Sequence, residues 1–249
     1  MPACQDIDDA LRDWPYEPGV ISARIVHARD GREVVQLRIE MGVMQMEIDH
    51  RPDGRRPGGY ETYLDFLLQE EGSKGGEFVL SEEQCDEVDR EFVEYYHRRI
   101  CWLALREFDR AIRDADHTLA LMDFVLEHSP SEEWTLSHEQ YRPFVLFHRT
   151  QAAALASLDK LGAEAAIEEI DRGLAHVRKI FESVDGEEQF EEDEMVHQLL
   201  ELKEGIRKHY HVGRTLAEQL AEAVAAEQYE LAARIRDEMA RRRHSPKRR

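Results

Sequence analysis

An apolar repeat with the 3.6-residue period of an α-helix begins just after residue 81 and recurs through most of the remaining chain. This feature limits the fold more than any other, because such stripes are buried by packing helix against helix. The first stripe is formed by Phe92, Val93, Tyr96, Ile100 and Leu103. The pattern predicts helices over about 82–105, 108–127, 138–161 and 191–210, with another through 167–180 and an acidic turn, GEEQFEEDE, before the last. Pairs that resemble capping boxes mark three expected helix starts: Ser81 with Gln84, Ser137 with Gln140, and Thr215 with Glu218.

The region before these helices has the two-residue period of β-strands. Apolar side chains alternate with polar ones from Val35 to Met41, and at Gly42 the apolar set shifts by one position. Such a shift at a glycine indicates a bulge or a tight bend. An Asp-Gly turn at residues 30–31 precedes this segment. We therefore expect a small antiparallel sheet of two long strands or three short ones.

A loop with two prolines and three glycines, HRPDGRRPGGY, follows the predicted strands. It is cationic through Arg51, Arg55 and Arg56, although the whole chain has a net charge of −20. One interpretation is a surface turn that leads into the predicted helix YETYLDFLLQEE. The other is a loop that contacts an anion or a partner protein through its arginines.

The charge distribution disfavours nucleic-acid binding by most of the surface, because phosphates are repelled by an acidic protein. The C-terminal segment from residue 234 is the exception, since eight Arg or Lys residues there face only two carboxylates. Its cations either suit the C-terminal end of a helix or contact an acidic or nucleic-acid partner. Three widely spaced cysteines, no signal-like N-terminus and no 18-residue apolar run predict a cytoplasmic protein with no disulfide framework and no membrane partner.

No catalytic arrangement stands out from the sequence. There is no GxxxxGK phosphate loop and no paired CxxC motif. Two ExxH pairs, Glu94 with His97 and Glu194 with His197, have the spacing of a di-iron site. The second pair, however, falls opposite the apolar stripe of its predicted helix. We therefore predict no enzyme activity, no cofactor and no metal site.

The C-terminal segment LAEQLAEAVAAEQYELAARIRDEMARRR predicts two short helices joined at AEQY. Leu216, Leu220, Ala223 and Val224 share one face of the first helix, and Ile235 with Met239 forms an i, i+4 pair on the second. Alanines allow two antiparallel helices to approach closely. A hairpin of this size is too small to be stable on one shared face. Its apolar surface must therefore rest on its own chain, on an identical hairpin or on another protein.

This segment resembles the UVR motif, the helical hairpin shared by the B and C subunits of the bacterial excision-repair nuclease. The resemblance rests on the aromatic–Glu–x–Ala–Ala–x–aliphatic–Arg–Asp run and its preceding leucines, and it covers about a tenth of the chain. It implies a protein-contact element in a bacterial protein, whose partner is another UVR hairpin or a second copy of this chain. By position, it implies these protein-binding residues: Leu220, Val224, Tyr229, Glu230, Ile235, Arg236 and Asp237.

The central helices more weakly resemble tetratricopeptide repeats, although no clean repeat period is visible. A generic helical bundle is the alternative. Together the patterns predict a mainly α (α+β) protein with four segments: a β-meander with its basic loop and a short helix at 1–76, a tetratricopeptide-like array at 77–213, a UVR-like hairpin at 214–243 and a basic tail at 244–249. We expect a non-catalytic protein-interaction adaptor or assembly protein. The alternative is a DNA-repair accessory protein that uses the basic tail and the arginine-rich loop against nucleic acid.

Overall fold

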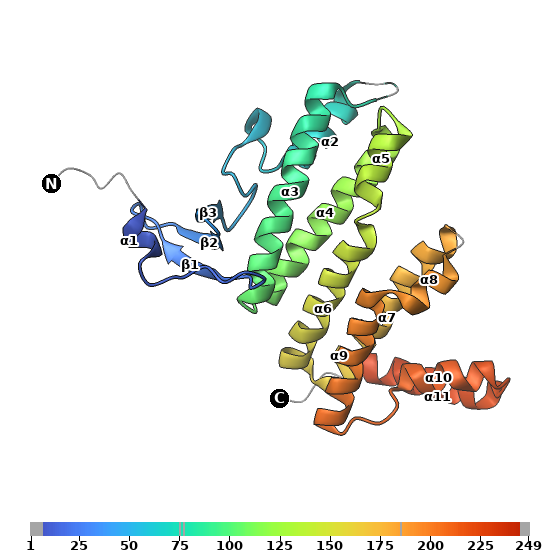
Figure 1. The fold of residues 1–249 in the computed structure, drawn as a ribbon. Coiled ribbons are helices and arrows are strands. Elements are labelled where there is room, and N and C mark those ends of the chain that lie inside the picture. The colour runs from blue at the N-terminus through green and yellow to red at the C-terminus, as the bar shows by residue number, and fades with distance from the viewer. Residues whose placement is uncertain (1–6, 75, 77, 185, 245–249) are drawn as a thin grey trace. The chain divides into compact units, whose positions relative to one another are not determined.

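A computed structural model of the 249-residue chain describes residues 7–74, 76, 78–184 and 186–244 (Figure 1). The chain divides into two compact units, residues 1–152 and 153–249, and each is described by itself. The fold class is the predicted one: a small antiparallel sheet precedes an array of helices, and a helical hairpin follows. In the part of the chain that the structure describes, no helix is both long enough and apolar enough to span a membrane.

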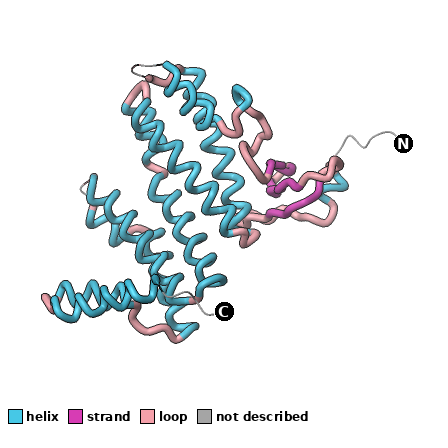
Figure 2. The backbone as a smooth tube through the Cα atoms, turned by 180° about the vertical axis from the view of Figure 1, so that it is seen from behind, coloured by secondary structure: helices cyan, strands magenta, loops and turns pink. Residues whose placement is uncertain are grey.

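The first unit opens with a short helix, α1 (Asp8–Leu11), and a three-stranded meander, shown in magenta in Figure 2. Its strands are β1 (Ala23–His27), β2 (Glu33–Ile39) and β3 (Gly42–Glu47), with β2 in the centre. The shift at Gly42 is a tight turn, because Gly42 pairs with Ile39 across two intervening residues. Gly31 has a φ of 88° in the turn between β1 and β2, a conformation that glycine adopts without steric cost. The predicted small antiparallel sheet is confirmed, and of the two alternatives it has the three short strands.

The loop after β3 contains one short 3-10 turn, η1 (Pro57–Gly59), and ends at helix α2 (Tyr63–Lys74). Gly58 has a φ of 55°, and a Cβ atom there would lie 2.7 Å from Cδ2 of Phe66. A side chain at this position would thus be strained and would also collide with α2. Gly58 therefore allows the loop to pass close to the helix.

Helices α3 (Glu82–Ala104) and α4 (Phe108–His128) form the centre of the first unit and pack as an antiparallel pair (Figure 1). The predicted capping box at the start of α3 is confirmed, with reciprocal bonds between Ser81 and Gln84. The predicted apolar stripe of α3 is not its most buried face, since Val93 is exposed. The buried face instead contains Val88, Glu91, Tyr95, Arg98 and Trp102. Because Glu91 and Arg98 are polar residue types, the apolar pattern in the sequence did not show this face.

The predicted start of the next helix near residue 138 requires a correction. A separate helix, α5 (Glu132–Glu139), comes first, and its N-cap is Ser131, whose side chain accepts a bond from the Trp134 amide. Ser137 therefore lies inside α5 and forms no capping box with Gln140. Helix α6 (Arg142–Leu161) follows, and its first half packs through Val145 against α4.

The second unit contains the end of α6, then α7 (Ala163–Ser183), α8 (Glu187–Glu192) and α9 (Glu194–Tyr210). Helices α7 and α9 pack against each other and bury Ile167, Ile170 and Leu199. The acidic segment predicted as a turn is the short helix α8, which buries Phe190. The unit ends with α10 (Leu216–Ala225) and α11 (Tyr229–His244).

Candidate protein-interaction site

The two C-terminal helices form a hairpin whose ends are fixed by local hydrogen bonds. At the start of α10, Thr215 and Glu218 form the predicted capping box. At its end, the Gln228 amide donates to the Ala223 carbonyl at 2.8 Å and the Glu227 amide donates to the Val224 carbonyl at 3.0 Å. This is the Schellman arrangement, and Glu227 occupies its left-handed position with a φ of 57°. The chain reverses here without a glycine.

The hairpin has a small core of its own. Ala223, Ala232 and Ile235 are buried, and Leu216, Leu220 and Met239 pack around them. The alanines lie where α10 and α11 face each other, as their close approach requires. Leu220 and Ile235 thus belong to the hairpin interior, whereas the sequence had placed both among the contact residues.

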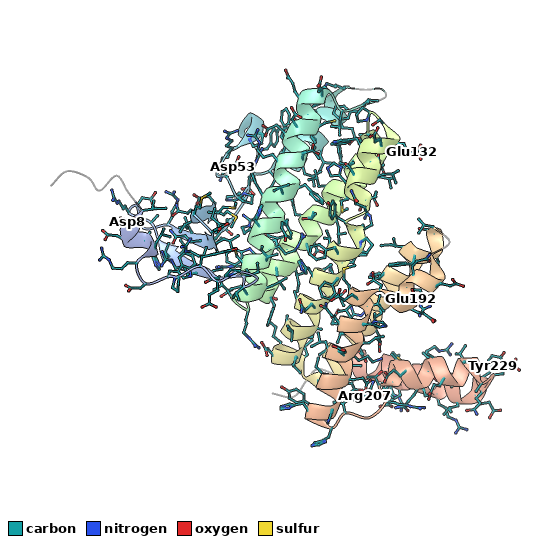
Figure 3. The ribbon with its side chains drawn as sticks, in the orientation of Figure 1. Asp8, Asp53, Glu132, Glu192, Arg207 and Tyr229 are labelled. Atoms are coloured by element: carbon teal, nitrogen blue, oxygen red, sulfur yellow. The ribbon has the colours of Figure 1, made fainter. Side chains whose placement is uncertain are left out.

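Several apolar side chains of the hairpin remain in solvent. Tyr229 is 68% exposed, Val224 52% and Leu231 45%. Val224 is thus more exposed than Leu216, Leu220 and Ala223, with which it was grouped on one helix face. Figure 3 shows Tyr229 at the far tip of the hairpin, away from Arg207 at its base. The tip consequently offers contact area that the hairpin does not use to hold itself together.

The polar residues implied by the motif are also in solvent. Glu230, Arg236 and Asp237 are all exposed on α11. The Arg236 guanidinium lies 3.7 Å from the Asp237 carboxylate, and both side chains are at least 70% exposed. An ion pair this exposed contributes little to stability, so both groups are available to a partner.

A cluster of charges holds the base of the hairpin to the rest of the second unit. The Glu218 carboxylate lies 2.7 Å from Nζ of Lys203 and 2.6 Å from Nη2 of Arg207, both on α9. Lys203 in turn lies 2.6 Å from Asp171 on α7. Burial alone would raise the pKa of Glu218, but the bonds from Lys203 and from the Thr215 amide lower it to about 2. The sequence showed the Thr215–Glu218 cap and gave no sign of these cations on another helix.

Residues 214–243 match the family model of the UvrB/uvrC motif. The hairpin is therefore similar to the UVR motif over its whole length. The match contains α10, the turn after it and nearly all of α11, so it concerns the hairpin and not the other 219 residues. Neither the search of curated proteins nor the search of solved structures found a match.

The arginine-rich loop differs from the sequence expectation at one position. Arg51 is 1% exposed and points inward, where its guanidinium lies 2.8 Å from Glu87 and 3.4 Å from Glu94. It is thus removed from the set of arginines available to an external anion, because carboxylates of α3 already surround it. Arg55 and Arg56 remain 63% and 51% exposed.

The groups that fix this loop are buried polar residues that the sequence did not reveal. Glu91 is fully buried and accepts bonds from the amides of Tyr63 and Leu64 at 2.7 and 3.1 Å. Arg98 forms two bonds of 2.7 and 2.8 Å with the buried carboxylate of Asp114. Their only sequence signal was their position on the buried side of the helical repeat, at i, i+7 spacing on α3.

The two ExxH pairs lie in different surroundings. Glu194 and His197 are exposed on α9, on the side away from its buried residues, as predicted. Glu94 contacts Arg51. Burial and the neighbouring charge of Asp53 raise the pKa of Glu94 to about 6, against the opposing effect of Arg51. Among the described residues, no group of three His, Cys, Asp or Glu side chains is placed to hold a metal ion.

Proposed function

We propose that this protein is a non-catalytic adaptor whose UVR hairpin binds another protein. The observation that carries the proposal is that the hairpin completes its own core with Ala223, Ala232 and Ile235 and still leaves Tyr229, Val224 and Leu231 in solvent. Large side chains kept exposed at one end of a small element are typical of contact sites, where aromatic residues contribute most binding energy. The match to a motif known for protein–protein contacts supports the same role.

The charge cluster at the hairpin base supports this proposal too. Because Glu218, Lys203 and Arg207 hold the first turn of α10 against α9, the hairpin is presented in a defined orientation within its unit. A binding element fixed before it meets its partner loses less entropy on association. The partner is a protein with a complementary helical surface, and a second copy of this chain is one such protein.

The test uses surface variants that leave the hairpin core intact. Val224→Ser with Tyr229→Ser removes the exposed tip, and Tyr210→Ser is the matched control, because Tyr210 is 52% exposed on α9 outside the motif. Immobilised full-length protein, the tip variant and the control are compared by quantitative mass spectrometry of captured bacterial proteins. Sedimentation equilibrium of each variant reports self-association separately.

We expect the tip variant to lose a defined partner, or the dimer, that both the wild type and the Tyr210→Ser control retain. Truncating such anchor side chains costs about 2–4 kcal/mol of binding free energy, which corresponds to a loss of roughly 30-fold or more in affinity. Equal capture and equal association for all three proteins would show that the hairpin is only a structural element. We also propose that the protein acts in the cytoplasm and has no catalytic activity of its own. A cytoplasmic partner in the capture experiment would support the first of these proposals.

One observation favours a second candidate function, association with nucleic acid. Arg234 and Arg236 are exposed on α11, and Arg55 and Arg56 are exposed on the loop; most of the basic tail expected to assist them, residues 245–249, lies outside the described residues. Binding that uses these cations releases counterions, so its affinity for duplex DNA would fall steeply with salt concentration. A flat salt dependence, or no binding at 50 mM salt, would exclude this alternative.

A further inference from the structure

A cavity of about 600 Å³ opens beside the arginine-rich loop, in the first unit. Its wall comes from the turn before β2, from the end of β3 and from residues 48–56 of the loop. This volume lies within the range of small-molecule sites in proteins. Asp53, labelled in Figure 3, belongs to this wall on the side of α3.

The backbone of the cavity wall is held by more bonds than a surface turn needs. Arg98 donates to the carbonyls of Glu47 and His50 at 3.0 and 2.7 Å, and the hydroxyl of Tyr95 donates to the same His50 carbonyl at 3.2 Å. Arg113 donates to the carbonyl of Ile48 at 2.6 Å. The loop is therefore rigid before any ligand arrives, and this rigidity is what a precise binding site requires.

One residue of the wall has an unfavourable backbone conformation. His50 has a φ of 56°, which costs energy for a residue other than glycine. Bonds from Arg98 and Tyr95 to its carbonyl hold the residue in this conformation. Strain that is held in place in this way is concentrated at functional sites.

The rim of the cavity supplies guanidinium groups with donors to spare. Among the described residues, the carboxylate contact of the Arg55 side chain is to Asp53 at 3.5 Å, and that of Arg56 is to Glu61 at 3.9 Å. Both distances are too long for strong hydrogen bonds. Two adjacent arginines with unused donors match the oxygens of a phosphate group.

The remaining wall has charges of both signs. Arg32 lies 3.1 Å from Glu47. Asp49, which accepts a bond from Arg113 at 3.0 Å, and Glu33 line the cavity with side chains that are 62% and 40% exposed. Carboxylates accept hydrogen bonds and repel further negative charge. A ligand that satisfies both sides has one anionic group for the arginines and hydroxyl or amino groups for the carboxylates.

We propose that this cavity binds a small phosphorylated molecule that also carries hydrogen-bond donors, such as a sugar phosphate. A nucleic-acid chain fits less well, because its many phosphates would meet these carboxylates and the surface of a protein with a net charge of −20. The site belongs to the first unit, and the proposal does not depend on the adaptor role proposed for the hairpin.

The test is a titration of full-length protein with ribose 5-phosphate, followed by amide NMR shifts at Asp49 and Gly54. Ribose and inorganic phosphate are the matched ligand controls, and a short DNA duplex tests the polymeric source of phosphate. Arg55→Gln with Arg56→Gln is the test variant. Arg234→Gln with Arg236→Gln is the control, because it removes the same charge from the hairpin.

We expect saturable shifts with ribose 5-phosphate that weaken about tenfold or more in the loop variant and persist in the hairpin control, as the loss of a charge-assisted bond predicts. We expect ribose and inorganic phosphate each to bind more weakly than the joined molecule. No saturable shift, an unchanged affinity in the loop variant, or tighter binding of the DNA duplex would overturn the proposal. An unchanged amide spectrum elsewhere shows that the loop variant is folded.

Discussion

The loop after β3 and the C-terminal hairpin both present arginines and apolar groups to solvent, but they are built by opposite means. The loop is held by buried charges, with Arg51, Glu91 and Arg98 each almost fully enclosed. The hairpin is held by alanines and one isoleucine, and the charges that tie it to α9 lie at its base. Removing one partner of a buried ion pair is strongly destabilising, because the other charge stays buried without compensation. Truncating a side chain of an apolar core costs an amount that depends on the number of buried atoms removed. The two regions should therefore fail differently when they are perturbed.

The largest expected effect comes from Arg98→Ala in the loop support. This change removes the two short guanidinium bonds of the fully buried Asp114 carboxylate, which keeps Arg113 at 3.5 Å and the Trp102 indole. It also removes two bonds to the carbonyls of Glu47 and His50. We expect the free energy of unfolding of the first unit to fall by about 3–5 kcal/mol. Urea denaturation followed by tryptophan fluorescence measures it, because Trp14, Trp102 and Trp134 all lie in the first unit.

The exposed ion pair of the hairpin supplies the matched control for that experiment. Asp237→Ala removes a carboxylate that is 70% exposed, so its effect should remain within about 0.5 kcal/mol. If both variants lowered the free energy of unfolding by similar amounts, the two regions would not differ in how they depend on their charges.

A smaller and more local effect is expected from Ile235→Ala in the hairpin. The change removes much of the apolar contact between α10 and α11, and its cost is about 2 kcal/mol, at the low end for a large-to-small core substitution. Hydrogen exchange should show loss of protection across residues 216–241 and unchanged protection in α3 and α4. Loss of protection in α3 as well would mean that the hairpin and the first unit unfold together.

The two regions should also respond to pH in opposite directions. The pKa of Glu218 falls from its ordinary value of 4.5 to about 2 in the folded hairpin, so its contribution is present above pH 4.5 and is lost as the pH falls towards 2. The pKa of Glu94 rises from 4.5 to about 6 beside the loop, so its contribution is present below pH 4.5 and is lost as the pH rises through 6.

Two amide substitutions separate these contributions. Glu218→Gln should reduce the loss of unfolding free energy that the hairpin shows as the pH falls from 4.5 towards 2. Glu94→Gln should reduce the loss that the first unit shows as the pH rises from 4.5 to 6. Hydrogen exchange at each pH, resolved by segment, gives both slopes from one set of samples. A slope that survives its own substitution would assign the titration to another group.

The smallest effect is a gain in stability at the hairpin turn. Glu227 has a φ of 57° in a position where glycine carries no steric penalty. Glu227→Gly should stabilise the hairpin by about 1 kcal/mol. The melting temperature of the full chain and protection of the Gln228 amide report it, and a loss of stability would show that the Glu227 side chain has a supporting contact of its own.

The sequence predicted most of the elements because their signals are local. The alternation around Gly42 gave the strands, and the boxes at Ser81 and Thr215 gave two helix starts. The box expected at Ser137 was wrong, because a similar signal six residues earlier, at Ser131, begins the helix. Local motifs of this kind cannot show which of two nearby candidates is used.

The parts that the sequence could not supply depend on residues far apart in the chain. Arg51 looked like a surface cation until Glu87 and Glu94, more than 35 residues later, were found around it. The apolar stripe predicted on α3 does not coincide with its buried face. That face contains Glu91 and Arg98, which are polar residues and are buried because they have hydrogen-bond partners inside the protein. In the candidate site the motif supplied Tyr229 and Arg236, whereas the support from Lys203 and Arg207 lies outside the motif.

The alanine contact at the centre of the hairpin has a consequence for how such a protein can change its associations. Because Ala223 and Ala232 are buried where the two helices meet, larger residues at these positions would push the helices apart. The side chains at positions 224, 229 and 231 face solvent, so their size does not affect how closely the two helices pack. Descendants of this gene can therefore exchange one binding specificity for another by surface substitutions while inheriting the same hairpin.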